Sequence, residues 1–252
     1  MTSKIKFIDL FAGTGAFSLA LTKNNNFECV LANDMMVSSQ KIYELNHPEH
    51  NFLLEDLNDI ELDDIPEHNL LCGGFPCQPF SIAGNKKGFE DKRANVFWKI
   101  IDILKHREPE YIILENVKNL KSHDKGNTYI TIMNKLSEIG YHMKTCILDT
   151  SKITEVPQHR ERIYMIGFRN EEKCESFNFD FPVLEKGSIC DFLQEEIPEK
   201  YYYTDRFKVY EEIEKGITKN ISENVIYQYR RYFVRENKNN LCPTLTANMG
   251  SG

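Results

Sequence analysis

The chain has 252 residues, of which 41% are hydrophobic and 12% aromatic, so it can bury one sizeable core and a small second domain. This composition excludes a disordered chain, and no apolar run approaches the roughly 18 to 20 residues of a membrane-spanning helix. The formal net charge of −7 excludes a basic surface over the whole molecule, so any contact with a polyanion must be local. We therefore expect a soluble, cytoplasmic protein with no membrane contact.

Strand-length apolar runs alternate with helical patterns over the first two thirds of the chain, which predicts an α/β fold with a mostly parallel sheet. The predicted strands are residues 5–10, 29–33, 51–54, 70–73 and 111–115. The predicted helices are residues 16–23, 36–45, 95–105 and 128–139. Two further apolar stretches, 142–148 and 162–168, flank a polar loop with a proline and are expected to close the sheet as a hairpin.

The composition of the sequence changes after Arg169, where an acidic and aromatic stretch replaces the alternation of predicted strands and helices. We therefore predict a first domain of residues 1–170 and a smaller second region of residues 171–252, which is rich in tyrosine. The seven cysteines include no C-x-x-C pair, which predicts reduced thiols and neither a disulfide framework nor a metal site.

The first predicted strand runs into a turn with two glycines, Gly13 and Gly15, and then into a helix. Glycines there let the backbone turn tightly and let a ligand approach the start of the helix, although such a turn is often purely structural. Asp34 ends the second strand 21 residues after Gly13, where a carboxylate can accept hydrogen bonds from ribose hydroxyls. Asp56, after the third strand, could reach an adenine amine. Ser18 replaces the third glycine of the dinucleotide fingerprint, which favours a sulfonium nucleoside over a nicotinamide dinucleotide.

The fourth predicted strand leads into a loop stiffened by glycine and proline, Gly74-Phe75-Pro76-Cys77-Gln78-Pro79-Phe80-Ser81. Parallel sheets keep their active sites at the carboxyl ends of their strands, and Cys77 is placed there. A partly exposed thiolate is a nucleophile, whereas Cys72, among leucines, suits a small buried hydrophobe.

Glu115 ends the fifth strand and could hold a proton for a substrate heteroatom; the alternative is an exposed acid or a cap for the next segment. Arg160 and Arg162 share one face of an extended chain, because strand side chains repeat every two residues. Two guanidinium groups there fit a phosphate or a base carbonyl, with a surface ion pair as the alternative.

Five ordered motifs closely resemble those of the DNA cytosine 5-methyltransferase family, of the bacterial restriction-modification type. They are Phe11-Ala12-Gly13-Thr14-Gly15, Asn33-Asp34, Gly74 to Ser81, Glu115-Asn116-Val117 and Gln158-His159-Arg160-Glu161-Arg162. The resemblance covers about Ile5 to Phe168. Pro243 to Ala247 resembles, more weakly, a segment of the family's target-recognition domain. It implies a Rossmann-like, S-adenosylmethionine-dependent methyltransferase fold in residues 1–170, and a linker with a partial target-recognition domain in residues 171–252.

The resemblance also assigns roles residue by residue. The residues implied in cofactor binding are Phe11, Gly13, Gly15, Asp34, Met35, Asp56 and Pro76. Cys77 resembles the nucleophile, Glu115 the residue that binds the ring nitrogen and amine of the base, and Arg162 the donor to its carbonyl, supported by Arg160. The residues of a basic loop expected to close over DNA are Ser81, Lys86, Lys87 and Arg93.

The implied reaction is methyl transfer to carbon 5 of a cytosine flipped out of double-stranded DNA, through a covalent cysteine adduct. Two alternatives from other classes are a nicotinamide oxidoreductase and a DNA-binding half without turnover of its own. A tRNA substrate is also compatible with the chemistry. The family continues past the recognition domain into further motifs and a final helix, so we expect a truncated product, a cloned fragment, or one subunit of a split enzyme with a second chain.

Overall fold

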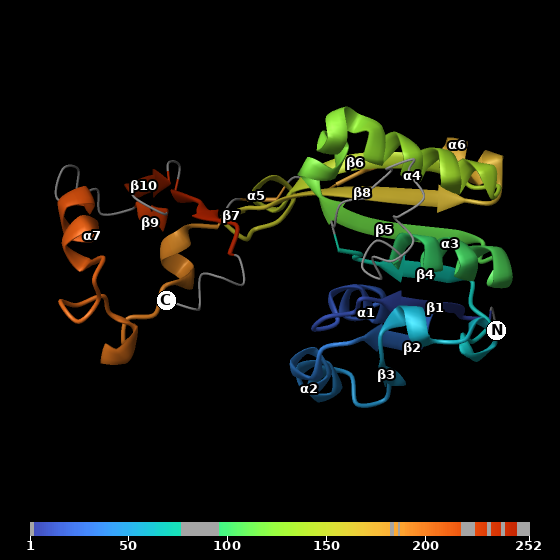
Figure 1. Ribbon diagram of the computed structural model, residues 1–252, viewed down its shortest axis with the longest axis horizontal. Helices are drawn as coiled ribbons and strands as arrows, with labels where there is room; N and C mark the ends of the chain where they lie inside the picture. Colours follow the sequence, from blue (N-terminus) through green and yellow to red (C-terminus); the bar gives the residue numbers. More distant parts are fainter. Residues whose placement is uncertain are drawn as a thin grey trace, which may run out of the picture. The chain divides into compact units, whose positions relative to one another are not determined.

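The computed structural model describes residues 3–76, 96–181, 184–185, 187–217, 225–230, 233–237 and 240–245 (Figure 1). The chain forms two compact units. Unit 1 comprises residues 1–147 and 162–179, and unit 2 comprises residues 148–161 and 180–252.

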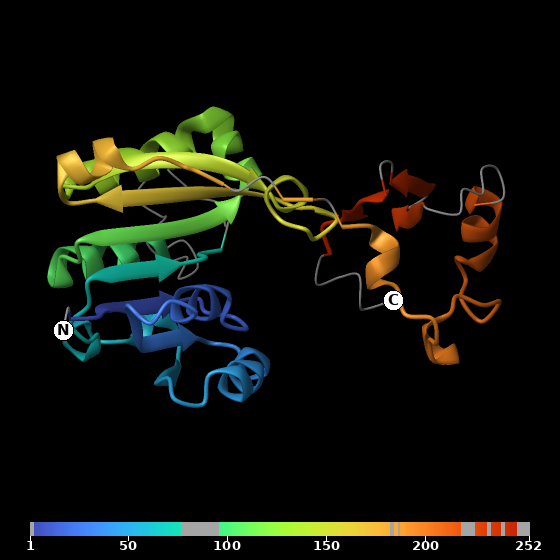
Figure 2. The ribbon, with the colours of Figure 1, turned by 180° about the vertical axis from the view of Figure 1, so that it is seen from behind.

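Unit 1 is built on a seven-stranded sheet in the order β3-β2-β1-β4-β5-β8-β6. Its strands are β1 (Ile5–Leu10), β2 (Phe27–Asp34), β3 (Phe52–Leu54), β4 (Leu70–Gly73), β5 (Tyr111–Val117), β6 (His142–Asp149) and β8 (Glu161–Phe168). The first five strands pair in parallel, and β8 pairs antiparallel with β5. Figure 2 shows the arrow of β8 opposed to that of β5. The strand order reverses between β1 and β4, which is where open α/β sheets bind ligands.

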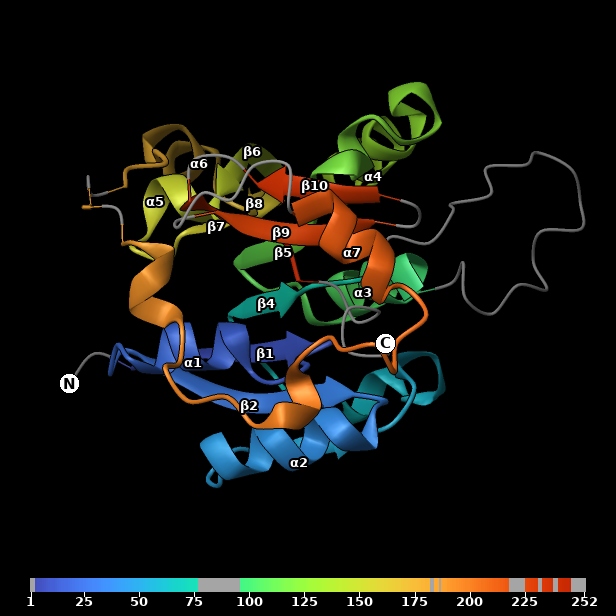
Figure 3. The ribbon, with the colours of Figure 1, turned by 90° about the vertical axis from the view of Figure 1, so that its left-hand side faces the viewer.

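Helices cover both faces of this sheet (Figure 3). They are α1 (Ala16–Thr22), α2 (Val37–Asn46), α3 (Val96–Arg107), α4 (Asn127–Glu138) and α6 (Glu171–Ser176). Side chains alternate along β1, so Ile8 and Leu10 join the core with α3 and α4, while Phe7 packs with Phe17 and Leu21 of α1. Short 3-10 turns lie at Leu57–Asp59, Leu62–Asp64, Lys118–Lys121 and His123–Gly126.

The α/β fold and the parallel sheet predicted from the sequence are confirmed. Strands β1 and β4 match their predicted ranges, whereas β2 begins two residues early because Phe27 and Glu28 pair with Ile5 and Lys6. The two predicted strands of the hairpin lie side by side as β6 and β8 at one end of the sheet.

The predicted division at residue 170 differs from the observed one in two ways. Residues 171–179 belong to unit 1, because Lys173 pairs with Glu110 at 3.2 Å and the ring of Phe177 lies 5.3 Å from that of Phe168. Residues 148–161, which run from the end of β6 to the start of β8, group with unit 2. Local composition predicted neither, because both follow from contacts between distant segments.

Unit 2 contains small elements joined by short pairings. They are α5 (Thr150–Ile153), β7 (Gln158–His159), α7 (Tyr210–Ile217), β9 (Ile226–Arg230), β10 (Phe233–Asn237) and β11 (Cys242–Pro243), with 3-10 turns at Ile189–Phe192 and Glu199–Tyr201. Strand β7 pairs in parallel with β11, and β9 pairs antiparallel with β10. None of the helices in the described ranges has the length and apolar character needed to cross a membrane.

The turn between β1 and α1 depends on two glycines with positive φ, 56° at Gly13 and 92° at Gly15. A Cβ on Gly13 would meet no atom nearer than the Phe11 carbonyl oxygen at 3.9 Å. A Cβ on Gly15 would lie 2.7 Å from Nε2 of His47 and 3.0 Å from Cδ2 of Tyr43. Gly15 therefore allows α1 and α2 to approach closely.

We predict that Gly13→Ala costs about 1 to 2 kcal/mol of unfolding free energy, from left-handed strain alone. Gly15→Ala should cost about 1 to 3 kcal/mol more, because the added methyl also overpacks against α2. Urea unfolding followed by circular dichroism measures both. Equal losses would contradict the close packing inferred at Gly15.

Candidate functional site

Apart from Arg162 on β8, the described site residues of unit 1 lie near or after the carboxyl ends of parallel strands. Strand β1 leads into the glycine turn, β2 ends at Asp34, β4 leads to Pro76, and β5 carries Glu115 near its end. Because these strands are parallel, their ends share one edge of the sheet. That edge is where ligands bind in open α/β sheets.

The glycine turn and Asp34 form one hydrogen-bonded unit. The Gly13 N–H donates to Oδ2 of Asp34 at 2.9 Å, and the Met36 N–H donates to Oδ1 at 2.8 Å. The Ala12 N–H donates to the carbonyl of Asn33 at 2.9 Å, which joins the turn to β2 a second time. Each carboxylate oxygen keeps a further lone pair, so Asp34, which is half-buried, can still accept hydrogen bonds from a ligand.

Asn33, a motif residue with no role predicted from the sequence, joins the ends of β2 and β3. Its buried side-chain amide donates to the carbonyls of Leu53 and Glu55 at 3.0 and 2.9 Å. Asp56 then caps the next 3-10 turn, where its Oδ1 accepts from the backbone and the side chain of Asn58, both at 3.0 Å. The cap accounts for the position of Asp56, and its contact with an adenine stays a prediction.

The other residues predicted to bind a cofactor differ in accessibility. Met35 is 62% exposed beside Asp34 and offers an apolar surface for a flat ring. Pro76 is exposed, whereas Phe11 is half-buried against the main core. Gly15 is buried next to α2, so its missing side chain serves helix packing.

Asp9 lies in β1, shortly before the glycine turn, and its carboxylate is buried. No role was predicted for it from the sequence. Its Oδ2 accepts from the Ser18 N–H at 3.1 Å and from the Ser18 hydroxyl at 2.7 Å. Its Oδ1 is buried without a hydrogen-bond partner among the described residues. Burial raises the pKa of Asp9 to about 6, although the two Ser18 donors oppose the rise.

Glu115 and Arg162 are brought together by the antiparallel pairing of β5 and β8. Nε of Arg162 lies 2.8 Å from Oε1 of Glu115, with both side chains mostly buried. A Cβ on Gly74 would lie 3.5 Å from Oε2 of Glu115, so this carboxylate is next to the segment that follows β4. Both residues were predicted from the sequence, and in the structure they form an ion pair.

Asn116 holds the segment after β4 in place. Its buried amide donates to the Phe75 carbonyl at 2.9 Å, and its Oδ1 accepts from the Val117 N–H at 2.8 Å. The chain is thereby anchored just before Pro76. Five predicted site residues lie outside the described residues, so the structure does not place them: Cys77, Ser81, Lys86, Lys87 and Arg93.

Arg160 belongs to unit 2, where its carbonyl accepts from the N–H of Thr150 at 3.1 Å. In the same unit, Nδ1 of His159 lies 2.8 Å from Oδ2 of Asp149. Burial works to raise the pKa of Asp149, but hydrogen bonds from Ser151 and His159 outweigh it and lower the pKa. The grouping of Arg160 with Arg162 stays a prediction, because the two residues belong to different units.

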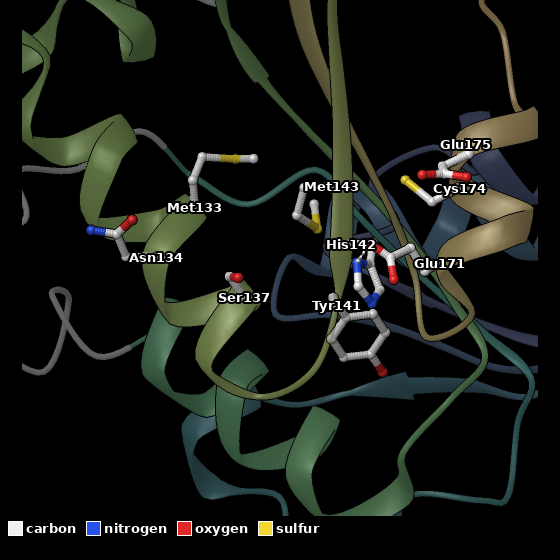
Figure 4. A pocket seen from close by; sticks show the side chains of 9 residues that line it. All are labelled: Met133, Asn134, Ser137, Tyr141, His142, Met143, Glu171, Cys174 and Glu175. Carbon is white, nitrogen blue, oxygen red and sulfur yellow. Dashed lines mark ion pairs between the residues drawn. The ribbon is translucent and has the colours of Figure 1, made fainter.

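A cavity of about 420 Å³ lies elsewhere in unit 1, among α4, β6 and α6 (Figure 4). Its lining residues are Met133, Asn134, Ser137, Tyr141, His142, Met143, Glu171, Cys174 and Glu175. No predicted site residue is among them. Across the described ranges, no group of three or more His, Cys, Asp or Glu side chains is arranged to hold a metal ion.

Known proteins resemble this chain over most of its length. Residues 5–251 match the model of the family described as C-5 cytosine-specific DNA methylase. The chain is 40% identical to the type II methyltransferase M.Bsp6I of Bacillus sp. (strain RFL6), over 98% of this chain and 79% of that protein. It is also 40% identical to the type II methyltransferase M.HhaI of Haemophilus parahaemolyticus, over 80% of this chain but only 61% of that protein.

Solved structures show the same fold. The structure titled S. pombe Dnmt2 methyltransferase matches with a TM-score of 0.64 and 25% identity, over 79% of this chain and 63% of that chain. The Spodoptera frugiperda DNMT2 mutant matches with a TM-score of 0.62 and 26% identity, over 78% of this chain and 62% of that one. This chain therefore spans less than two thirds of the length of both.

We predict that Asp9 makes stability depend on pH. Its pKa is raised from 3.8 to about 6, so its contribution is fully present below pH 3.8 and is lost as the pH rises through 6. The loss is at most about 3 kcal/mol. Asp9→Asn should lack this pH-dependent loss of stability. The difference in unfolding free energy between the variant and the wild type should therefore change between pH 4 and 7. A difference that is constant across this range would contradict the prediction.

Proposed function

The chain belongs to the C-5 cytosine-specific DNA methylase family, and from this premise we propose that it methylates carbon 5 of a cytosine in double-stranded DNA through a covalent adduct with Cys77. S-adenosylmethionine is the methyl donor of the family. The observation that carries the proposal is the Glu115–Arg162 pair, held beside the segment that leads to Cys77.

The glycine turn fits the nucleoside of the cofactor. Gly13 has open space where a side chain would be, and Asp34 has lone pairs for ribose hydroxyls. Met35 is exposed beside this carboxylate and would cover the adenine. When bound, S-adenosylmethionine would supply a methyl group on a positively charged sulfur.

The Glu115–Arg162 pair fits the edge of a cytosine. A carboxyl group can bind the ring nitrogen and the exocyclic amine, while a guanidinium donates to the neighbouring carbonyl. Glu115 and Arg162 present these two groups side by side, with their Oε1 and Nε atoms 2.8 Å apart. A base stacked in a duplex cannot reach them, so the target must be flipped out.

In the proposed reaction, the Cys77 thiolate bonds to carbon 6 while the ring nitrogen takes a proton from the Glu115 carboxyl, which makes carbon 5 electron-rich. S-adenosylmethionine would supply the methyl group that carbon 5 takes up, and its sulfur would keep the electrons of the broken bond. Carbon 5 then loses its proton to a base, the thiolate leaves as the carbon 5–carbon 6 double bond reforms, and the ring nitrogen returns its proton to Glu115.

We assign target recognition to unit 2, and contact with the DNA backbone to Ser81, Lys86, Lys87 and Arg93. The second subunit expected from the sequence finds no support in the comparisons and stays a prediction. An assay of residues 1–252 alone on DNA tests that expectation directly.

We predict that Cys77→Ala lowers methyl transfer to DNA by about 100-fold or more, because no nucleophile remains to activate carbon 5. Affinity for S-adenosylmethionine should change less than about twofold. Transfer of labelled methyl groups and calorimetry measure the two effects. Cys190→Ala is the matched control, because Cys190 is an exposed cysteine that belongs to unit 2.

DNA with 5-fluorocytosine at the target should also trap an adduct with the wild type, since fluorine blocks the final elimination. An active preparation without such an adduct would refute the covalent route.

We predict that Asp34→Ala weakens S-adenosylmethionine binding by about 1.5 to 3 kcal/mol, through the lost charge-assisted hydrogen bonds to ribose. Asp64→Ala, at an exposed aspartate away from the turn, is the control. Calorimetry measures the S-adenosylmethionine affinity of both variants. Equal affinities would contradict ribose binding by Asp34 and would restrict its role to its hydrogen bonds with the backbone.

A further inference from the structure

A chain of four hydrogen-bonded side chains connects β1 to the segment after α2. Oδ2 of Asp9 accepts from the Ser18 hydroxyl at 2.7 Å, and the Ser18 oxygen lies 2.7 Å from the Tyr43 hydroxyl. The Tyr43 hydroxyl lies 2.9 Å from Nδ1 of His50. The first three side chains are completely buried, whereas His50 is partly accessible.

This series of hydrogen bonds begins at the start of α1, which lacks a side-chain cap of its own. The N-cap residue is Gly15, which has no side chain and makes no capping hydrogen bond. The Ser18 N–H in the first turn of α1 instead donates to Asp9. Asp9 on β1 therefore fixes the start of α1, and with it the turn that contains Gly13.

The hydroxyl groups allow two directions of donation along the chain. With Asp9 ionised, Ser18 donates to Asp9, Tyr43 donates to Ser18, and Nδ1–H of His50 donates to Tyr43. With Asp9 protonated, each bond can reverse, and Nδ1 of His50 becomes the acceptor. The charge of Asp9 and the protonation of His50 are therefore linked through two hydroxyl groups.

Other titratable groups also act on the two ends. Cys72 of β4 is paired with Asp9 in the sheet, and Sγ of Cys29 on β2 lies 3.9 Å from the Ser18 hydroxyl oxygen. The negative charge of Asp34 disfavours ionisation of Asp9. Burial and the neighbouring His47 lower the pKa of His50, while Glu49 opposes this. His47 stacks on His50 with ring centres 4.8 Å apart.

We propose that Asp9, Ser18, Tyr43 and His50 form a positioning relay, in which the proton state of His50 is coupled to the charge of Asp9 and thereby to the geometry of the cofactor turn. The part that concerns the cofactor rests on the proposed function. Ionised Asp9 is the stronger acceptor for the Ser18 N–H and favours a cationic ligand nearby. Affinity for S-adenosylmethionine should therefore rise as Asp9 ionises.

The first test needs no cofactor and follows the His50 ring by NMR from pH 4 to pH 9. Asp9→Asn removes a negative charge and should shift the His50 midpoint down by about half a pH unit. In a Tyr43→Phe background the same Asp9→Asn change should shift it much less. Equal shifts in both backgrounds, or none in either, would overturn the relay.

Tyr141→Phe is the matched control. Tyr141 is also buried, but its hydroxyl donates to the Pro109 carbonyl and takes no part in the chain. Its removal should leave the His50 titration unchanged. Ser18→Ala breaks the chain at another point, and it replaces Tyr43→Phe as the background if the latter does not fold.

The second test measures S-adenosylmethionine affinity by calorimetry from pH 5 to pH 8. The wild type and Tyr141→Phe should gain about threefold to tenfold in affinity as the pH rises, and Asp9→Asn should lose most of this gain. Identical pH profiles for wild type and Asp9→Asn would overturn the positioning role. A wild type that binds at no pH contradicts the proposed function, and the NMR titration still decides the coupling.

Discussion

The hydrogen bond from the Gly13 N–H to the Asp34 carboxylate is the interaction on which the candidate site depends. It joins a turn after β1 to the last residue of β2, so two segments 21 residues apart become one rigid surface. The left-handed backbone at Gly13 points the N–H toward the carboxylate. The same carboxylate also accepts the Met36 N–H, so the start of α2 is positioned by the group that we expect to bind ribose.

Antiparallel pairing of β8 with β5 provides the other half of the site. A parallel neighbour would bring its own carboxyl end to this edge, whereas β8 brings its first residues there. Arg162 is therefore placed opposite Val117 and reaches Glu115. Alternation along β5 then separates two roles, because Glu115 faces Arg162 while the next residue, Asn116, is buried against the Phe75 carbonyl.

Much of this arrangement was predictable from the sequence, because it depends on strand ends and short motifs. Asp34 and Glu115 were identified from their places at the ends of apolar runs and Arg162 from its motif, and the structure puts Glu115 and Arg162 in contact. The capping role of Asp9 and the packing role of Gly15 were not predictable, since both depend on helices that approach from elsewhere in the chain. The division of the chain was also missed, because residues 148–161 group with distant segments.

The contact between Gly15 and His47 constrains how this protein can change in evolution. These positions are 32 residues apart in the sequence, yet a Cβ on one would lie 2.7 Å from the ring of the other. A larger residue at position 15 would need a smaller or displaced side chain at position 47, and it would still meet Tyr43 and adopt a left-handed backbone. Two positions that look independent in the sequence are therefore coupled through packing.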